Sequence, residues 1–389
     1  MSRASSLRLR PMLPRDPHES GRTASTLELF FDLVFVIAVS ITAVQLHHSL
    51  SEGHVGAGIL SYAMVFFAIW WAWMNFTWFA TSFDTDDWLY RVLTIVQMGG
   101  VLVLAAGVVP AFQDHDFRLA ILAYIVMRLA LVAQWLRASR HTPLRRTALT
   151  YAGGVVVVQG LWVLFLLVPA QLAIPAFIVF ALCELAVPVL AERSATTPWN
   201  PHHITERYGL FALILLGESL LASANAVIEA VGEGEHIGEL VAISVLALIV
   251  TAALWWIYFW APHHTAITDL RGSITYGYGH IVVFAAAGAL SAGIEAEIDY
   301  ILGHSHLSAL GASFAYTVPI AVFVLGIWVL AIRRHGDPWV NTCVPLGAVL
   351  VLIDPLLPVP FALTTIIMVG VVAVLVWRRP VGVEAAHAG

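Results

Sequence analysis

The chain has 389 residues, 60% of them hydrophobic and 11% charged, and a formal net charge of −6 at pH 7. A water-soluble domain carries roughly 25% charged residues. This composition therefore excludes a soluble globular protein and predicts an integral membrane protein. The small negative charge and the missing basic tract argue against nucleic acid as a partner. Cys183 and Cys343 lie in apolar runs and form neither a disulfide framework nor a Cys-x-x-Cys motif.

Residues 1–24 are polar and arginine-bearing, and the apolar run after them is too long for a cleavable signal peptide. We expect them to form a cytoplasmic tail. A membrane-spanning helix needs about 20 apolar residues. By that criterion we expect an all-α polytopic membrane protein with twelve spans, at 27–47, 56–80, 91–112, 118–138, 147–168, 171–191, 205–228, 238–260, 275–295, 307–332, 339–354 and 359–377. Prolines leave the last two segments short, so they could instead form a re-entrant pair.

Arginine placement gives the expected orientation, because cytoplasmic loops collect basic residues. On one side the tail and the loops carry Arg3, Arg8, Arg10, Arg15, Arg22, Arg91, Arg137, Arg140, Arg145, Arg146, Arg193, Arg207, Arg271, Arg333, Arg334, Arg378 and Arg379. The loops on the other side carry Arg118 and the acids Glu229, Glu233, Glu235, Glu239, Glu295, Glu297 and Asp299. Both termini are therefore expected to be cytoplasmic.

The second half of the chain repeats features of the first. Asp84 follows Trp70 by 14 residues, and Asp269 follows Trp255 by the same number. This spacing predicts two six-helix halves, 25–195 and 196–380, in a parallel repeat, followed by a short cytoplasmic tail, 381–389. Chance similarity between helices rich in Trp and Leu is the alternative.

Two acids open the first span. Glu28 and Asp32 are four residues apart, so they share one helix face. Glu28 follows Thr26 as Glu206 follows Thr205, which predicts that both acids cap the starts of helices. Asp32 lies a turn deeper, where capping does not explain it, and it is the better functional candidate.

Arg128 is expected near the middle of the membrane, roughly 15 Å from the start of its span. An arginine at that depth requires an acidic partner. Glu218, at a similar depth, is the first candidate, Glu184 the second and Asp32 the third. Such a group is either a structural ion pair that fixes how helices dock or a site that couples to protons or ions.

Further polar residues are candidates for a substrate or ion pathway. Glu218 and Asn225 lie on a small, polar helix face that suits either close helix packing or a cavity. His280, about one turn inside its span, either relays protons or is a hydrogen-bonded structural residue.

Other histidines and the tryptophans have simpler expected roles. His47, His48, His54, His202, His203, His263, His264, His304 and His306 lack a metal-ligand spacing such as His-Glu-x-x-His, and solvated loop residues are the expected state. We expect no metal site and no cofactor. Interfacial belts explain the aromatic residues Trp70, Trp71, Trp73, Trp78, Trp255, Trp256 and Trp260.

Several blocks carry a family resemblance: 28–36, 206–211 with 216–219, 255–259 and 278–280. In these blocks the chain resembles the bacterial low temperature requirement A (LtrA) membrane proteins. The resemblance implies a bacterial inner-membrane protein connected with growth in the cold, without a defined reaction. The positions it implies are Glu28, Asp32, Arg128, Glu206, Glu218 and His280.

The leading functional hypothesis is a secondary transporter or permease for a small polar or ionic solute, with buried carboxylates that couple to protons. Its partners would be the lipid bilayer and a small solute or proton. A membrane enzyme that acts on lipid or a lipid-linked substrate is the alternative, although no motif assigns a nucleophile. A sensor or scaffold is a third class.

Overall fold

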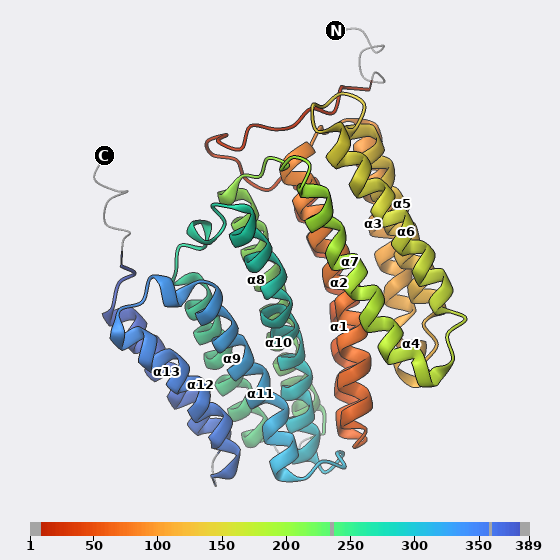
Figure 1. The fold of residues 1–389 in the computed structure, drawn as a ribbon. Coiled ribbons are helices and arrows are strands. Elements are labelled where there is room, and N and C mark those ends of the chain that lie inside the picture. Colours follow the sequence, from red (N-terminus) through yellow and green to blue (C-terminus); the bar gives the residue numbers. More distant parts are fainter. Residues whose placement is uncertain (1–8, 234–236, 358–359, 382–389) are drawn as a thin grey trace. The chain divides into compact units, whose positions relative to one another are not determined.

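The computed structural model describes residues 9–233, 237–357 and 360–381. The expectations for Arg3, Arg8, Glu235, the tail beyond residue 381 and the side chains of Glu229 and Glu233 lie outside this description. The described residues form helices joined by short loops and no strand. In chain order (Figure 1) the α-helices are α1 (Thr26–Ser51), α2 (Val55–Phe83), α3 (Trp88–Ala106), α4 (Val108–Gln113), α5 (Arg118–Ala138), α6 (Arg145–Phe165), α7 (Ala173–Glu192), α8 (Pro201–Glu233), α9 (Ile237–Phe259), α10 (Leu270–Leu302), α11 (Ala309–Leu330), α12 (Pro338–Ile353) and α13 (Pro360–Trp377).

The prediction of an all-helical membrane protein is confirmed. Eleven helical segments within the described ranges are long and apolar enough to cross a membrane. The apolar stretch Phe361–Trp377 is shorter. Twelve spans, the parallel repeat and the orientation of the termini stay predictions.

The chain folds into two compact units. Unit 1 contains residues 1–41 and 64–207, and unit 2 contains 42–63 and 208–389. The division falls within α1, α2 and α8, so each of these helices contributes to both units. The sequence-predicted halves 25–195 and 196–380 stay an expectation.

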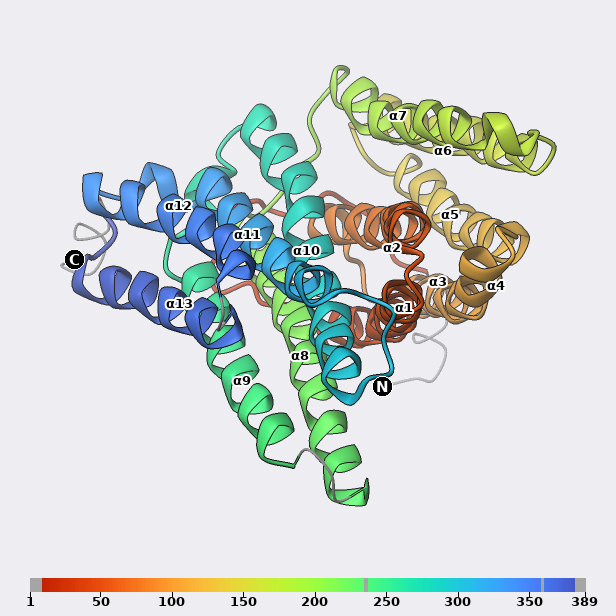
Figure 2. The same cartoon turned by 90° about the horizontal axis from the view of Figure 1, so that it is seen from below.

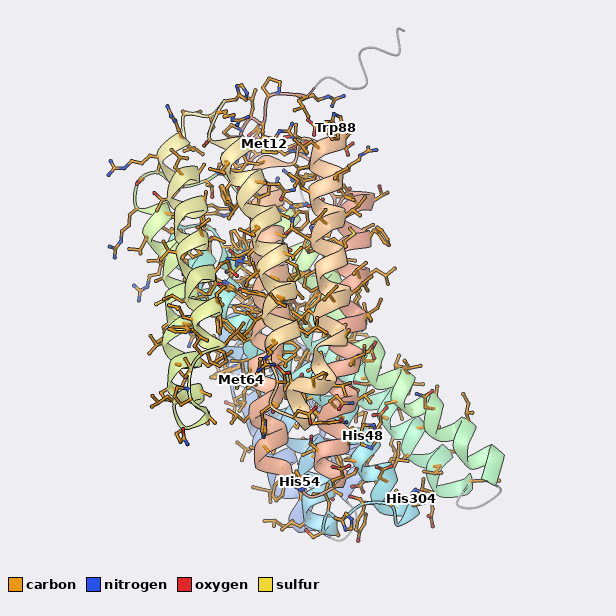
Figure 3. All side chains as sticks on the ribbon, turned by 90° about the vertical axis from the view of Figure 1, so that its right-hand side faces the viewer. Met12, His48, His54, Met64, Trp88 and His304 are labelled. Atoms are coloured by element: carbon orange, nitrogen blue, oxygen red, sulfur yellow. The ribbon has the colours of Figure 1, made fainter. Side chains whose placement is uncertain are left out.

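In unit 1, α3 packs on α5, α5 on α6 and α6 on α7, and Figure 2 shows the last pair side by side. Gly100 allows α3 to approach α5, since a Cβ there would lie 2.4 Å from the Met127 side chain. The N-terminal segment is anchored to the same unit. Met12 is fully buried near the start of α3 at Trp88 (Figure 3), and the backbone N–H of Arg15 donates to the Ser82 carbonyl.

Unit 2 is centred on α10, whose buried face carries many small residues and packs on α11. Gly293 is at the closest point, because a Cβ there would lie 2.2 Å from the carbonyl oxygen of Ala315. The helix ends at Gly303, which adopts the left-handed conformation (φ 75°) that glycine accommodates without strain. At the neighbouring ends of α1 and α2, His48 lies in the last turn of α1 and His54 lies in the loop before α2 (Figure 3).

Candidate functional site

The start of α1 carries a capping box. The backbone N–H of Ser25 donates to Glu28 Oε2 at 2.8 Å, and the Glu28 N–H donates to the Ser25 hydroxyl at 3.3 Å. Each residue thus satisfies a backbone donor that the helix end leaves free. The expected capping role of Glu28 is present, with Ser25 in place of Thr26 as the cap.

The capping role of Glu206 is wrong. Helix α8 begins at Pro201, five residues before Glu206, and its cap is Asn200, whose side chain accepts from the His203 N–H at 3.1 Å. Glu206 instead accepts from the backbone N–H of Ala24 at 3.1 Å. The early start of α8 also places the following residue, Arg207, inside the helix.

Arg207 holds both acids of α1 together. Its guanidinium donates to both carboxylate oxygens of Asp32, at 2.9 and 2.5 Å, and to Glu28 Oε1 at 2.9 Å. All three side chains are at most 1% exposed. The expectation that Arg207 belongs to a basic cytoplasmic loop is therefore wrong. Its fork-shaped guanidinium matches two carboxylates, as is typical of buried arginine.

Two more side chains complete this group. The Trp73 indole N–H donates to Asp32 Oδ1 at 2.7 Å. His203 Nε2 lies 3.2 Å from Glu28 Oε1, and the imidazole is fully buried. We call the group Glu28, Asp32, Trp73, His203 and Arg207 the Asp32 network. All of its residues belong to unit 1.

The charges of the Asp32 network do not cancel. Two carboxylates face one guanidinium and one imidazole, so the formal charges balance only when the group holds one further proton, on His203 or on a carboxylate, or a small cation. An uncompensated charge in a low-dielectric interior costs several kcal/mol.

A second polar group lies beside the network and is balanced by formal charge. It contains Arg15, Glu19, Arg22 and Asp84, in which Arg15 pairs with both acids. Arg22 donates to the carbonyl oxygens of residues 80 and 81. Burial raises the pKa of Asp84, and the negative charge of Glu28 raises it further, although Arg15 and Arg22 oppose the shift. Asp84 is thus the acid next to the network that most readily accepts a proton.

The partner of Arg128 is Glu184, the second of the three candidates. Arg128 donates to Glu184 Oε2 at 3.0 Å, and both side chains are almost completely buried. The first choice, Glu218, belongs to unit 2 and is half-buried on α8. The third, Asp32, is bonded to Arg207 instead.

Glu184 accepts four further hydrogen bonds, from the side chains of Trp71, Tyr124, Gln159 and Trp162 at 2.8–3.2 Å. These residues, with Arg128 and Glu184, form the Glu184 network. Four neutral donors and one guanidinium compensate this carboxylate fully. The Nε and Nη1 atoms of Arg128 have no hydrogen-bond partner among the described residues. The arrangement corresponds to the structural alternative, an ion pair that docks α5 and α7.

Helix α2 supplies an indole to each network. Trp71 and Trp73 are two residues apart, which places them about 200° apart around the helix and therefore on opposite faces. Trp71 bonds Glu184 and Trp73 bonds Asp32. Trp70, Trp71 and Trp73 are at most 1% exposed, so an interfacial belt is the wrong explanation for them. Trp255 and Trp256 are 44% and 43% exposed, as a belt requires.

Unit 2 contains a buried group of tyrosines and histidines. His280 Nδ1 donates to the Tyr276 carbonyl at 2.8 Å, and its Nε2 faces the Tyr258 hydroxyl at 3.2 Å. His263 donates from Nε2 to the Tyr258 carbonyl at 2.6 Å, and its Nδ1 faces the Tyr276 hydroxyl at 2.9 Å. Both rings are satisfied as neutral imidazoles.

Three expected loop histidines are therefore not solvated. His263 and His203 are buried, and burial lowers the pKa of His263 to about 4. His47 lies between Glu295 at 3.2 Å and Asp299 at 2.7 Å. Among the described residues, no group of three His, Cys, Asp or Glu side chains has the geometry to hold a metal ion.

The other pathway candidates are less enclosed. Asn225 is exposed on α8, and Glu218 is half-buried on the same helix. The structure thus joins Glu28 with Asp32 and Arg128 with Glu184, in two separate networks of unit 1.

The sequence analysis did not predict that Arg207 and His203 belong to the site. The available signal was Asn200-Pro201, an N-cap residue followed by proline at the first helical position, which predicts an earlier helix start.

Comparison with known proteins gives two findings. The sequence model of one family, described as "Bacterial low temperature requirement A protein (LtrA)", matches residues 23–377, which is nearly the whole chain. An uncharacterized protein of Rhizobium meliloti (strain 1021) is 27% identical over 334 residues, which cover 81% of this chain and 74% of the relative. The family match includes every residue of the two networks.

Proposed function

Because the chain belongs to the bacterial low temperature requirement A (LtrA) family and contains many helices that can cross a membrane, we propose that it is a secondary transporter or permease of the bacterial inner membrane. Its substrate is a small polar or ionic solute, and its transport is coupled to proton uptake at the Asp32 network. The single observation that carries the proposal is that two buried carboxylates, Glu28 and Asp32, share one guanidinium and contact a buried imidazole.

The charge imbalance gives a coupling mechanism. A proton or cation that enters the network restores neutrality, and its departure recreates the charge that disfavours burial. A change in the geometry of Arg207 against Asp32 therefore changes how strongly the network holds a proton. Asp84, with its raised pKa, lies next to the network and provides a step for proton entry.

The Glu184 network supports this site structurally. Its carboxylate is compensated by five donors, the Arg128 guanidinium included, and α2 connects it to the Asp32 network through Trp71 and Trp73. A rigid helix that is anchored on one face and carries an ion-binding group on the other holds that group in a fixed position. We assign a bracing role to Glu184 and Arg128 and the coupling role to Asp32 and Glu28.

Proteoliposomes with an internal pH-sensitive dye test the proposal. Gradients of alkali cations, amino acids and small organic acids are imposed in turn, and the internal pH is recorded. We expect at least one solute gradient to drive proton movement through the wild type. The movement should be lost in Asp32→Asn and kept in Arg91→Gln, which removes an exposed ion pair with Asp86. A wild type indistinguishable from empty liposomes across the panel contradicts the proposal.

A further inference from the structure

Unit 2 contains a polar group that the proposed function does not use. His47 and Ser51 lie four residues apart near the end of α1, and Glu295 and Asp299 lie four residues apart near the end of α10. Four residues are about one helical turn, so each of the two pairs shares one helix face. The two faces meet in unit 2.

His47 joins the two helix ends. Its Nε2 lies 2.7 Å from Asp299 Oδ2, and its Nδ1 lies 3.2 Å from Glu295 Oε2. The Ser51 hydroxyl donates to Asp299 Oδ2 at 2.7 Å. The Ser51 carbonyl accepts from the backbone N–H of His306 at 2.7 Å, so the loop after α10 is also held against the end of α1.

The two ring nitrogens of His47 determine how many protons this group needs. A neutral imidazole has one N–H donor and one nitrogen that can only accept. Whichever nitrogen lacks the proton would turn its lone pair toward a carboxylate oxygen, and that contact is repulsive. An imidazolium presents an N–H to Asp299 and another to Glu295, and two neighbouring carboxylates favour this charged form.

The surrounding titratable groups lie on several segments. Their members are His48 on α1, Glu52 and His54 after it, His304 after α10, and Glu218 on α8. Glu218 is close enough for its charge to act on Glu295. Carboxylates are fully charged near neutral pH and imidazoles only in part, so the acids determine the field at His47.

We propose that His47, Glu295 and Asp299 form a proton-binding site that ties the end of α1 to the end of α10. Their side chains are 14%, 22% and 25% exposed, so the proton exchanges with water at the surface. The proton is the cation that suits them, because no three His, Cys, Asp or Glu side chains of the described chain have the geometry of a metal site. The assignment is independent of the proposed transport activity.

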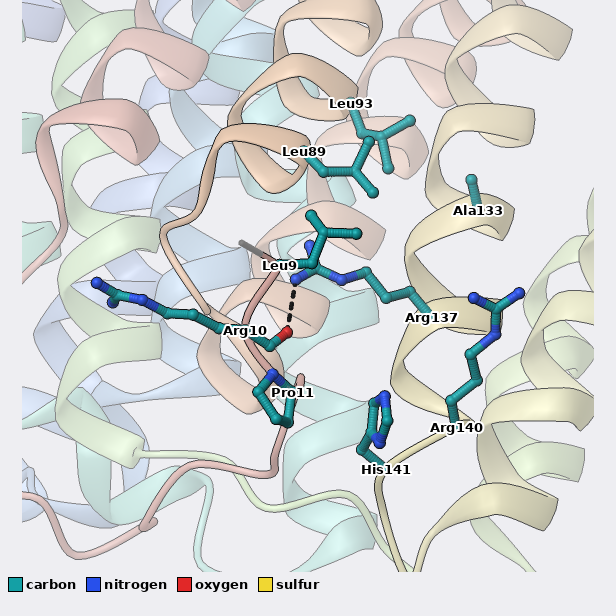
Figure 4. A pocket seen from close by; sticks show the side chains of 9 residues that line it. All are labelled: Leu9, Arg10, Pro11, Leu89, Leu93, Ala133, Arg137, Arg140 and His141. Atoms are coloured by element: carbon teal, nitrogen blue, oxygen red, sulfur yellow. Dashed lines mark hydrogen bonds between the residues drawn. The ribbon is translucent and has the colours of Figure 1, made fainter. Parts of the chain in front are cut away.

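The N-terminal segment is held in unit 1 by a contact of a different kind. Arg137 donates to Asp87 and, from the same guanidinium, to the Arg10 carbonyl at 2.9 Å (Figure 4). The Arg10 N–H donates to Asp87 Oδ2 at 3.1 Å. A guanidinium keeps its charge throughout the physiological pH range, whereas an imidazole gains or loses its charge within that range. The contact through His47 therefore depends on a bound proton on the basic partner.

Nuclear magnetic resonance of the full-length protein in detergent, labelled with ¹⁵N-histidine, tests the assignment. The shifts of the ring nitrogens distinguish an imidazolium from the neutral forms, and at pH 7.5 an ordinary exposed histidine is about nine-tenths neutral. We expect an imidazolium signal at this pH that is lost in His47→Gln. It should persist in His54→Gln, the matched control, because His54 is 72% exposed and pairs with the exposed Glu52.

A second variant removes the acids and keeps the histidine. In Glu295→Gln/Asp299→Asn the His47 signal should become that of a neutral imidazole, since both carboxylates that favour its charge are gone. The signals of His263 and His280, which are buried in the same unit, report whether unit 2 is folded. A neutral His47 in the wild type would overturn the proposal, and so would an imidazolium in the folded double variant.

Hydrogen exchange tests whether the proton ties the two helices together. At pH 7.5 the backbone amides of residues 43–51 should exchange about tenfold faster in His47→Gln than in His54→Gln, as expected for the loss of one charged hydrogen bond. Equal exchange in the two variants would show that the protonated His47 does not hold α1 to α10.

Discussion

Arg207 and Asp32 form a two-point ion pair inside the membrane protein, at 2.9 and 2.5 Å, although they are 175 residues apart in the chain. Glu28 shares the same guanidinium. The pair connects the first turns of α1 with the first turns of α8, and two carboxylates share its single guanidinium.

Removal of Arg207 should be strongly destabilising. Arg207→Gln leaves two buried carboxylates without their cation, and breaking a buried pair in this way costs about 3–5 kcal/mol. Unfolding of the purified protein in mixed detergent measures the loss. Arg91→Gln should show no measurable change, because its ion pair is exposed. If Arg207→Gln unfolds like the wild type, the ion pair does not hold α1 to α8.

Two glutamates on α7 should respond differently to loss of charge. Glu184→Gln deprives Arg128 of its partner and should cost about 3 kcal/mol. Glu192 accepts from Tyr151 and Thr197 without an arginine, so Glu192→Gln should cost about 1 kcal/mol. Unfolding curves of both variants give the comparison. Equal losses of stability would show that leaving the Arg128 charge without its partner does not affect stability.

The N-terminal segment should detach at low pH. Burial alone would raise the pKa of Asp87, but hydrogen bonds from Arg137 and from backbone N–H groups lower it below the ordinary value. A lowered carboxyl pKa contributes stability above the unfolded value of about 3.9 that is lost as the pH falls through the folded value. Hydrogen exchange of residues 9–15 should therefore accelerate well below pH 4.

The same release should occur at neutral pH in Asp87→Asn, since an amide cannot form the ion pair with Arg137. Asp86→Asn is the matched control, because Asp86 is exposed and its carboxylate accepts from the exposed Arg91. Equal hydrogen exchange in both variants would show that Asp87 does not anchor the N-terminal segment.

Acid should also loosen the loop after α9. Burial lowers the pKa of His263 to about 4, so between that value and the unfolded value of about 6.5 the unfolded state binds the extra proton. The local stability should fall by about 3 kcal/mol from pH 7 to pH 4. Hydrogen exchange measures it. His263→Gln should lose the pH dependence and His264→Gln should retain it; a flat profile in the wild type contradicts the assignment.

Sequence patterns predicted correctly those features that depend on a single helix. The four-residue spacing of Glu28 and Asp32 predicted a shared face, and both acids do contact Arg207. The distribution of hydrophobic residues was sufficient to predict a helical membrane protein. These properties depend on residues within a few turns of one another.

Contacts between residues from distant segments of the chain could not be predicted from the sequence. Depth alone could not choose between Glu218 and Glu184 for Arg128, because equal depth leaves the rotation and packing of each helix undetermined. Tryptophans in a row resemble an interfacial belt whether they face lipid or, as Trp71 and Trp73 do, buried carboxylates. Only the fold shows which carboxylates these indoles meet.

A difference titration measures proton uptake by the Asp32 network. Protons bound by wild-type protein and by Asp32→Asn are counted in matched detergent between alkaline and mildly acidic pH. In the variant, one carboxylate and one guanidinium already balance. We expect the wild type to bind one more proton per chain than the variant over this range. Superimposable titration curves would contradict it.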